Sequence, residues 1–292
     1  MSSPPPPERL RAAAAAALFI FFWSSGFVAA KYGFPYAEPF TFLALRYVVG
    51  SVILVPVCIL WKAAWPKTLG EIGHVVAAGL MVQSFYLVGV YYGIYLGIST
   101  GVVALVVGLQ PLLTGALAGM MLAERVTARQ WLGLVLGFVG LGLVVADKTT
   151  TAGASASAFA ITVFGLVSIT VGTLYQKRFC ATFDIRSSVA IQNIAGVVLM
   201  FALAGMFETM TVEWTGEFLF ALLWSALGLS LIALMLYYWL MRRGAAAKVT
   251  SLIYLSPPVT AIMGWLAFNE ILGPAAIAGM AIAAGGVALA TR

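Results

Sequence analysis

The feature that most constrains this chain is a series of ten apolar stretches, each long enough to cross a membrane and separated by short connections. The hydrocarbon core of a bilayer is about 30 Å thick and requires roughly 20 apolar residues in a helix. Hydrophobic residues make up 62% of the chain and charged residues only 9%, so lipid must surround much of this surface. The stretches are 12–30, 39–61, 72–96, 99–123, 128–146, 157–177, 187–207, 217–241, 246–268 and 273–290.

Helices are expected in these stretches, because a strand edge exposed to lipid leaves backbone groups unpaired at a cost of several kcal/mol each. A membrane barrel would alternate with a period of two, whereas 132–145 is apolar on every side. We therefore predict an all-α integral membrane protein with ten transmembrane helices. The proline-rich segment 1–11 is expected to be a disordered cytoplasmic tail. The short connections leave no room for an ATPase module or an extramembrane enzyme.

The basic residues predict the orientation of the helices. If both termini are cytoplasmic, only Lys31 and Lys148 of the 16 basic residues fall on the outer side. Arg46 falls within a span, which leaves 13 on the cytoplasmic side, a strong positive-inside signal. We predict a multi-pass protein of the cell inner membrane. The net charge of +6 then reflects anionic membrane lipid as a partner, and no nucleic acid is expected.

A shift of 146 residues, half of 292, aligns the two halves of the sequence without a gap. Each half holds five spans, an odd number, so the second half enters the membrane in the opposite sense. The sequence thus predicts two inverted repeats, 12–146 and 157–290, an architecture of transporters that hold substrate near the midplane between the halves. The shift pairs Lys31 with Lys177, Glu71 with Glu217, Tyr91 with Tyr237, Pro111 with Pro257 and Glu124 with Glu270.

Three motifs carry a family resemblance: the run Phe22–Val28, the Leu45-Arg46-Tyr47 triplet, and a Pro-x12-Glu spacing used twice before glycine-rich helices. They resemble the drug/metabolite transporter superfamily, and more narrowly its ten-helix EamA-type branch, which includes the YddG-like amino-acid exporters. The resemblance covers about 12–290. It implies cytoplasmic termini and a central cavity lined by the first four helices of each repeat, with the fifth as support. The four-helix multidrug relatives carry a glutamate in helix 1, whereas Leu18–Ala30 contains no acid.

Arg46 is the only charge well inside a predicted span. Ionisable groups within a membrane usually face a cavity or a partner, so Arg46 is a candidate anchor for a substrate carboxylate. The alternative is that its guanidinium extends to the outer headgroups. The shift of 146 places Gln192, also polar and within a span, opposite Arg46.

Hydroxyl and aromatic side chains form the second group of candidates. Ser84 and Tyr91 share a helical face, and Ser230 and Tyr237 are their counterparts. Such residues could stack on apolar substrates and donate hydrogen bonds, whereas aromatic residues near helix ends, such as Tyr95, are also typical of membrane interfaces. Trp23 and Gln83 are weaker candidates for the same cavity.

The mirrored prolines and glycines predict local features. Pro111 and Pro257 remove helical hydrogen bonds, so they set shape or act as gating hinges, with Gln110 and Ser256 lining the bends. Glu124 and Glu270 precede the last helix of each half, where an acid favours the helix dipole. The small-residue motifs starting at Gly133 and Gly279 predict close packing of 128–146 against 273–290 within one molecule.

The candidate residues are tyrosines, serines, glutamines and one arginine, with no acid, which suits neutral or zwitterionic solutes that have an apolar part. With the resemblance, they predict a secondary transporter that exports small metabolites, chiefly neutral and aromatic amino acids with broad specificity, by alternating access. A multidrug or other-metabolite exporter of the same superfamily is the alternative. One histidine and no mid-span acid give no basis for an enzyme, a metal site or a cofactor. A monomer is expected; proton exchange and facilitated diffusion both stay open.

Overall fold

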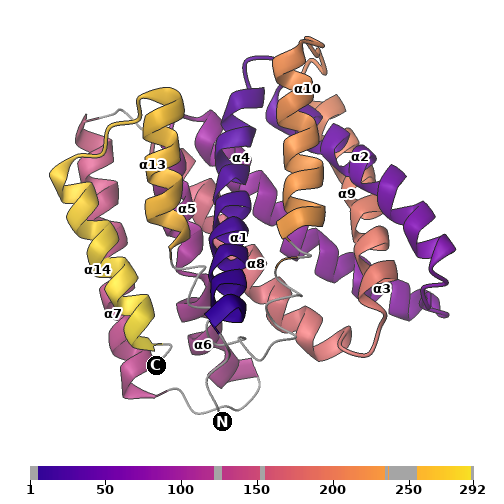
Figure 1. Cartoon of the computed structure of the whole chain (residues 1–292), viewed down its shortest axis with the longest axis horizontal. Helices are drawn as coiled ribbons and strands as arrows, with labels where there is room; N and C mark the ends of the chain where they lie inside the picture. Colours follow the sequence, from indigo (N-terminus) through magenta and orange to yellow (C-terminus); the bar gives the residue numbers. More distant parts are fainter. Residues whose placement is uncertain (1–5, 122–126, 152–154, 234–235, 237–254, 291–292) are drawn as a thin grey trace.

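The computed structural model describes residues 6–121, 127–151, 155–233, 236 and 255–290 (Figure 1). Throughout these ranges the regular elements are helical, and the one extended pairing is an isolated bridge between Ala37 and Val212. Six of the described helical segments are long and apolar enough to cross a membrane, and three shorter apolar helices accompany them. The prediction of an all-α membrane fold is confirmed in this form.

The helices of the first half follow the predicted ranges closely, except at the N-terminus. Helix α1 begins at Pro6, inside the segment 1–11 for which a disordered tail was expected. The elements are α1 (Pro6–Gly33), α2 (Pro39–Leu60), α3 (Leu69–Gly79), η1 (Leu80–Phe85), α4 (Tyr86–Tyr95), α5 (Thr100–Gly108), α6 (Gln110–Met121) and α7 (Ala128–Thr151).

The second half repeats this order over the residues that are described. Its elements are α8 (Ala156–Phe179), α9 (Ile185–Phe207), α10 (Gly216–Leu223), η2 (Trp224–Ala233), α13 (Ser256–Phe268) and α14 (Pro274–Ala290).

Polar side chains fix several helix starts at the membrane boundary. Thr68 and Glu71 form a reciprocal capping box before α3, and the Ser155 and Thr215 side chains accept from backbone N–H groups of α8 and α10. Asp184 caps α9 and also accepts hydrogen bonds from the Arg186 guanidinium. These bonds favour the ionised carboxylate and hold the pKa of Asp184 below its usual range.

Helices α7 and α14 pack antiparallel along one side of the bundle (Figure 1), as the small-residue motifs predict. A Cβ added to Gly286 would lie 2.6 Å from the Gly133 carbonyl oxygen, and Gly140 meets Gly279 with the same closeness. The shift of 146 exchanges these two contacts, because it relates Gly133 to Gly279 and Gly140 to Gly286. The packing is therefore that of two halves in opposite orientation.

Helices α2 and α9 form a second antiparallel pair with the same symmetry. Gly50 approaches the Asn193 amide, and Gly196 approaches the Tyr47 ring, with a built Cβ 2.9 Å from the neighbouring atom in each case. The shift of 146 relates Tyr47 to Asn193 and Gly50 to Gly196.

The ends of the α2–α9 pair are tied by a carboxylate on each side. Glu38, the residue before α2, accepts from the backbone N–H and hydroxyl of Thr209 at 2.8 Å. At the other end Asp184, the residue before α9, accepts from the Ala64 backbone N–H at 3.2 Å. Because Glu38 and Asp184 are counterparts under the shift, each end of the pair is closed in the same way.

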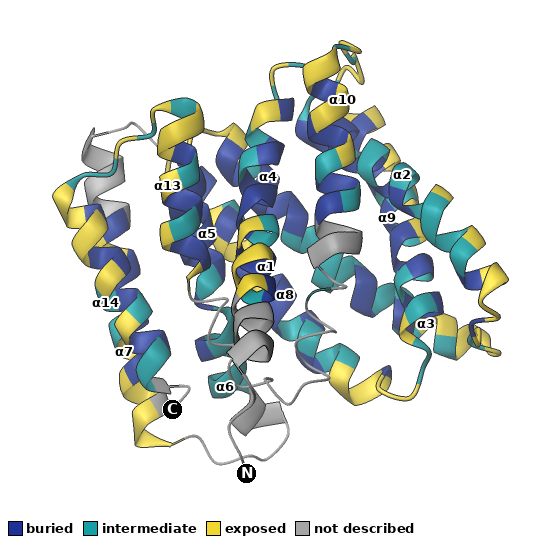
Figure 2. Cartoon of the chain, viewed as in Figure 1, coloured by how far each residue is buried: buried dark blue, intermediate teal, exposed yellow. Residues whose placement is uncertain are grey.

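Burial separates the inside of the bundle from an apolar outer surface (Figure 2). Val52 and Val198 are 67% exposed and Leu266 is 71% exposed, all in the middle or second half of apolar helices. Outward-facing apolar side chains on this scale are unfavourable in water and favourable in lipid. The described surface therefore fits a membrane-embedded bundle.

A candidate substrate cavity between the two halves

A cavity of about 300 Å³ lies between α1, α2, η1 and α4 of the first half and α8 and α9 of the second. Four of the residues predicted from the sequence line it: Trp23, Arg46, Gln83 and Tyr91. Its volume is at the lower end of the range for small-molecule sites, about 300–1,000 Å³. The cavity thus lies where an inverted repeat is expected to hold substrate.

Arg46 supplies the single charge among the described residues that line the cavity. Its Nη1 donates a hydrogen bond to the Tyr91 hydroxyl at 3.1 Å. The Tyr91 ring is fixed by Phe34 and Phe42, whose ring centroids each lie 5.6 Å away. Among the described residues, the hydrogen-bond partner of the guanidinium is this neutral hydroxyl, and none of the described residues that line the cavity is acidic.

The sequence also predicted Gln83 and Gln192, and the structure brings them together. Gln83 lies in η1 and lines the cavity, and its Nε2 donates to Gln192 Oε1 at 2.8 Å. Gln192 is only 2% exposed and is not among the residues that line the cavity. A Cβ on Gly79, one turn before Gln83, would overlap the Gln192 side chain, so glycine is needed there to admit it.

Other predicted residues do not line this cavity. Ser84 is fully buried, and Ser256 is buried with its hydroxyl 3.2 Å from that of Ser24 on α1. Gln110 donates to the Thr173 hydroxyl at 3.3 Å between α6 and α8. The side chain of Ser230 and the whole of Tyr237 lie outside the described residues.

Two polar lining residues, Tyr86 and Asn193, were not predicted from the sequence. The face of η1 and α4 toward the cavity repeats every four residues, through Gln83, Leu87 and Tyr91. Counting by sevens, as in a regular α-helix, ranked Ser84 above Gln83. A π-helix has more residues per turn than an α-helix, so a face counted with α-helical spacing drifts as it crosses η1.

The π-helical segments are themselves related by the repeat. The shift of 146 carries Leu80–Phe85 onto 226–231, which lies inside η2. Wide turns of this kind are rare and occur frequently at functional sites. Here η1 supplies Val82 and Gln83 to the cavity. The residue types of the two segments do not predict a π-helix.

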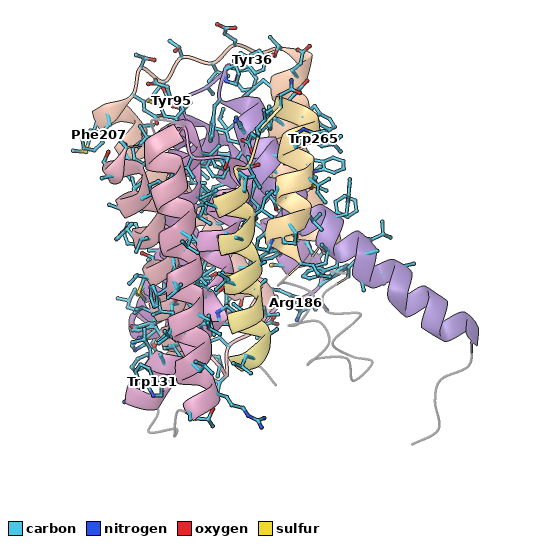
Figure 3. The ribbon with its side chains drawn as sticks, turned by 90° about the vertical axis from the view of Figure 1, so that its left-hand side faces the viewer. Tyr36, Tyr95, Trp131, Arg186, Phe207 and Trp265 are labelled. Atoms are coloured by element: carbon cyan, nitrogen blue, oxygen red, sulfur yellow. The ribbon has the colours of Figure 1, made fainter. Side chains whose placement is uncertain are left out.

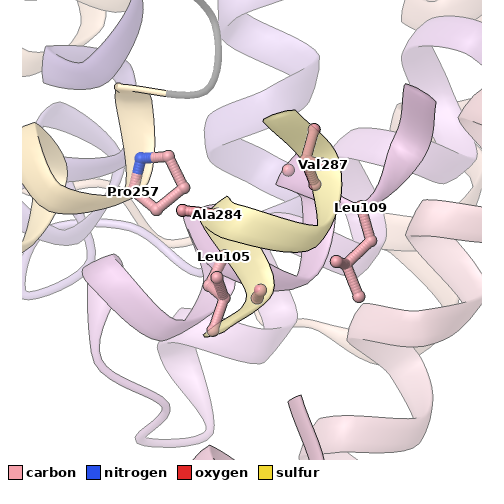
Figure 4. A pocket seen from close by; sticks show the side chains of 7 residues that line it. Leu105, Leu109, Pro257, Ala284 and Val287 are labelled. Atoms are coloured by element: carbon pink, nitrogen blue, oxygen red, sulfur yellow. The ribbon is translucent and has the colours of Figure 1, made fainter. Parts of the chain in front are cut away.

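Both mirrored prolines lie in the first turn of a helix, and in the first half the preceding helix ends just before it. Between α5 and α6 the helix breaks at Leu109, and Pro111 is the second residue of α6; Pro257 is likewise the second residue of α13. Proline is tolerated in a first helical turn because its missing N–H would have no partner there. Pro257 packs beside Leu105 and Ala284 around a small apolar gap where α5, α13 and α14 meet (Figure 4).

An ion pair joins three elements at the end of the bundle where α1 finishes. Lys31 Nζ lies 2.7 Å from Glu270 Oε1, and Glu270 Oε2 accepts from the Thr100 backbone N–H at 3.0 Å and from its hydroxyl at 2.8 Å. The dipole prediction for Glu270 is therefore corrected. The acid caps the N-terminus of α5 and not that of the helix that follows it in sequence, because the fold places Thr100, the first residue of α5, beside Glu270.

Aromatic residues mark the two ends of the bundle (Figure 3). Tyr36, Tyr95 and Phe207 lie toward one end and Trp131 toward the other. Tyr95 is 45% exposed, so its position favours the membrane-interface interpretation over a place in the cavity.

A multi-helix membrane bundle, with mirrored antiparallel contacts and a mostly apolar cavity that holds a few polar groups between its halves, defines the class: a membrane transporter built from a repeat. The chain belongs to the EamA-like transporter family, which matches residues 10–146 and again residues 156–292. The second match begins 146 residues after the first, so the family unit is the internal repeat of the sequence.

Several known proteins are similar to this chain over most of their length. The uncharacterized transporter YvbV of Bacillus subtilis (strain 168) is 25% identical over 88% of this chain and 84% of its own length. The uncharacterized transporter YoaV of the same organism is 21% identical over 85% of each chain. An uncharacterized transporter of Archaeoglobus fulgidus is 25% identical over 85% of this chain and 86% of its own. A solved structure titled only as a crystal structure of a protein has a TM-score of 0.64 at 18% identity, covering 97% of both chains, which supports the fold.

Proposed function

We propose that this transporter exports neutral and aromatic amino acids, with broad specificity, by alternating access at the cavity between its two halves. The observation that carries the proposal is the Arg46 guanidinium: the other described residues that line the cavity are uncharged, and its partner among them is a neutral hydroxyl. A carboxylate from the substrate would neutralise it. Trp23, Phe27 and Tyr86 offer aromatic surface for the rest of the solute.

The family and the curated relatives support transport of a small molecule and do not name the solute. The alternative, export of cationic drugs, is less well supported, because a cation would bring a second positive charge beside Arg46. No acidic side chain lines the described cavity to offset that charge.

The substrate class is tested with the purified full chain in liposomes. Uptake of labelled phenylalanine, leucine and alanine is expected to exceed that in empty liposomes, and lipophilic cations are expected to be poor competitors. Repeating the assay with and without a pH gradient separates proton exchange from facilitated diffusion. Transport confined to lipophilic cations would contradict the proposal and favour the multidrug alternative.

We further propose ten spans and cytoplasmic termini in a cell inner membrane, with the chain acting as a monomer. The start of α1 and the end of α14 lie at the same end of the bundle (Figure 1), in agreement with an even number of spans. The excess of basic residues on the cytoplasmic side of this arrangement supports the direction.

A reporter fusion tests this orientation. Alkaline phosphatase, which is active only outside the cytoplasm, is expected to give no signal when fused after Arg292, and a high signal when inserted between Lys148 and Ser155. A cytoplasmically active fluorescent reporter at the same sites provides the control and should show the opposite pattern. Strong phosphatase activity after Arg292 would overturn the orientation.

A further inference from the structure

Besides Arg46, the cavity holds the Gln83 amide, and the orientation of this amide is set by Gln192, which does not line the cavity. Gln83 donates from Nε2 to Gln192 Oε1, so its own Oε1 has no hydrogen-bond partner among the described residues. Gln192 in turn is fixed by close packing over Gly79. An amide anchored at its nitrogen presents its carbonyl oxygen, which is an acceptor.

We infer that Gln83 Oε1 accepts a hydrogen bond from the ammonium group of the substrate and that Gln192 is the positioning residue behind it. This inference rests on the proposed amino-acid transport and adds the group that distinguishes an amino acid from other carboxylates. Arg46 and Gln83 are the charged donor and the neutral acceptor of one cavity, which together match a zwitterion.

A neutral acceptor is the appropriate partner for the ammonium in this cavity. An acid in its place would pair with Arg46 and neutralise the charge that the substrate carboxylate needs. A carbonyl oxygen accepts from an ammonium through a charge-assisted hydrogen bond without competing for the guanidinium. Asn193 is a less suitable acceptor for the ammonium, because its Oδ1 lies toward Gly50 and its Nδ2 donates to the Val189 carbonyl oxygen.

Because Gln192 is buried, a polar and an apolar replacement of Gln83 are expected to have opposite effects. The Gln192 Nε2 is buried and has no hydrogen-bond partner among the described groups. Gln83→Glu would place an oxygen against Gln192 Oε1, so the Gln192 amide must turn to bring its Nε2 to the carboxylate, whose second oxygen stays toward the cavity with negative charge. Gln83→Leu would remove both the anchor and the acceptor.

Competition between matched analogues tests the inference in liposomes that contain the full chain. Phenylalanine is compared with 3-phenylpropanoate, which lacks the amino group, and with phenylalaninamide, which lacks the carboxylate. The wild type is expected to prefer phenylalanine to 3-phenylpropanoate by about tenfold to hundredfold, as loss of a charge-assisted hydrogen bond implies. Gln83→Leu should reduce that ratio to about twofold and leave the preference over the amide intact. Gln83→Glu should increase the first ratio and lower the preference over the amide, because the new carboxylate competes for Arg46.

Gln192 variants separate positioning from mere stability. Gln192→Leu should lower the phenylalanine to 3-phenylpropanoate ratio, and Gln192→Glu, which still accepts from Gln83 Nε2, should restore it. A purely structural role would change the Tm and leave the ratio unchanged, and that result would overturn the positioning role.

The outcomes also distinguish the two proposals. If the wild type transports phenylalanine and Gln83→Leu keeps the wild-type ratio, the assignment of Gln83 is wrong and amino-acid transport stands. If the wild type binds none of the amino acids, both proposals are wrong.

Discussion

Replacing Arg46 with glutamine is expected to weaken amino-acid binding by about tenfold to hundredfold. The loss corresponds to one charge-assisted hydrogen bond of about 1.5–3 kcal/mol between the guanidinium and the substrate carboxylate. Arg46→Lys should recover only part of the affinity, since an ammonium cannot form the planar, two-pronged contact of a guanidinium. Tyr91→Phe should give a smaller loss, because it removes the hydroxyl that accepts from Arg46 Nη1 and leaves the charge.

The measurement compares phenylalanine with phenylalaninamide in wild type and in Arg46→Gln. The wild type should discriminate strongly between acid and amide, and the variant should not. Thermal stability of the same preparations is the control, because an arginine that only contacts lipid headgroups would change stability and leave affinity as it was. A variant that keeps the wild-type preference would show that another group binds the carboxylate.

Replacing Glu270 with leucine is expected to destabilise the folded protein by about 3–5 kcal/mol. The Glu270 side chain is only 8% exposed and connects Lys31 on α1 with both donors of Thr100 on α5. Among the described residues, removing the carboxylate leaves the Thr100 hydroxyl without an acceptor and leaves the Lys31 ammonium with only the Phe268 ring, 4.9 Å from its centroid. Lys31→Met should cost less, because the lysine side chain is 32% exposed and Thr100 still donates to the carboxylate.

A charge exchange sharpens this second prediction. Lys31→Glu combined with Glu270→Lys restores an ion pair but turns an ammonium toward the Thr100 N–H, so it should rescue little of the stability. Thermal unfolding in detergent measures the effect, and Glu213→Leu, at an exposed acid of the connection between α9 and α10, is the control. Rescue to wild-type Tm by the exchange would show that only the Lys31 contact matters, and not the cap on α5.

The fold was predictable from the sequence to a large extent because apolar length and residue spacing determine it. The apolar stretches, the repeat of 146 and the packing of α7 against α14 all depend on local composition, and the structure and the family match agree with them. The partner of Glu270 was not predictable in this way. Lys31 and Thr100 are distant in the chain, so only the folded arrangement shows that the acid caps α5.

The candidate cavity was predictable in part. Arg46 and Gln83 stood out because polar groups are rare within spans, and both line the cavity. Ser84 was selected by regular helical spacing, which does not apply across the π-helix η1. Asn193 is also polar and lies within a predicted span, so the same signal applied to it; that it lines the cavity depends on the approach of α2 to α9.

The exchanged contacts between Tyr47 and Gly196 and between Gly50 and Asn193 have a consequence for the ancestry of the chain. Contacts related in this way require no covalent link between the halves. A five-helix protein that inserted into the membrane in both directions would form each of them twice, with a second copy of itself. Joining two such copies by gene fusion would let each half acquire its own basic residues and settle into one direction. Side chains on either half, such as Arg46 and Gln192, could then diverge independently, which a symmetric pair of identical chains does not permit.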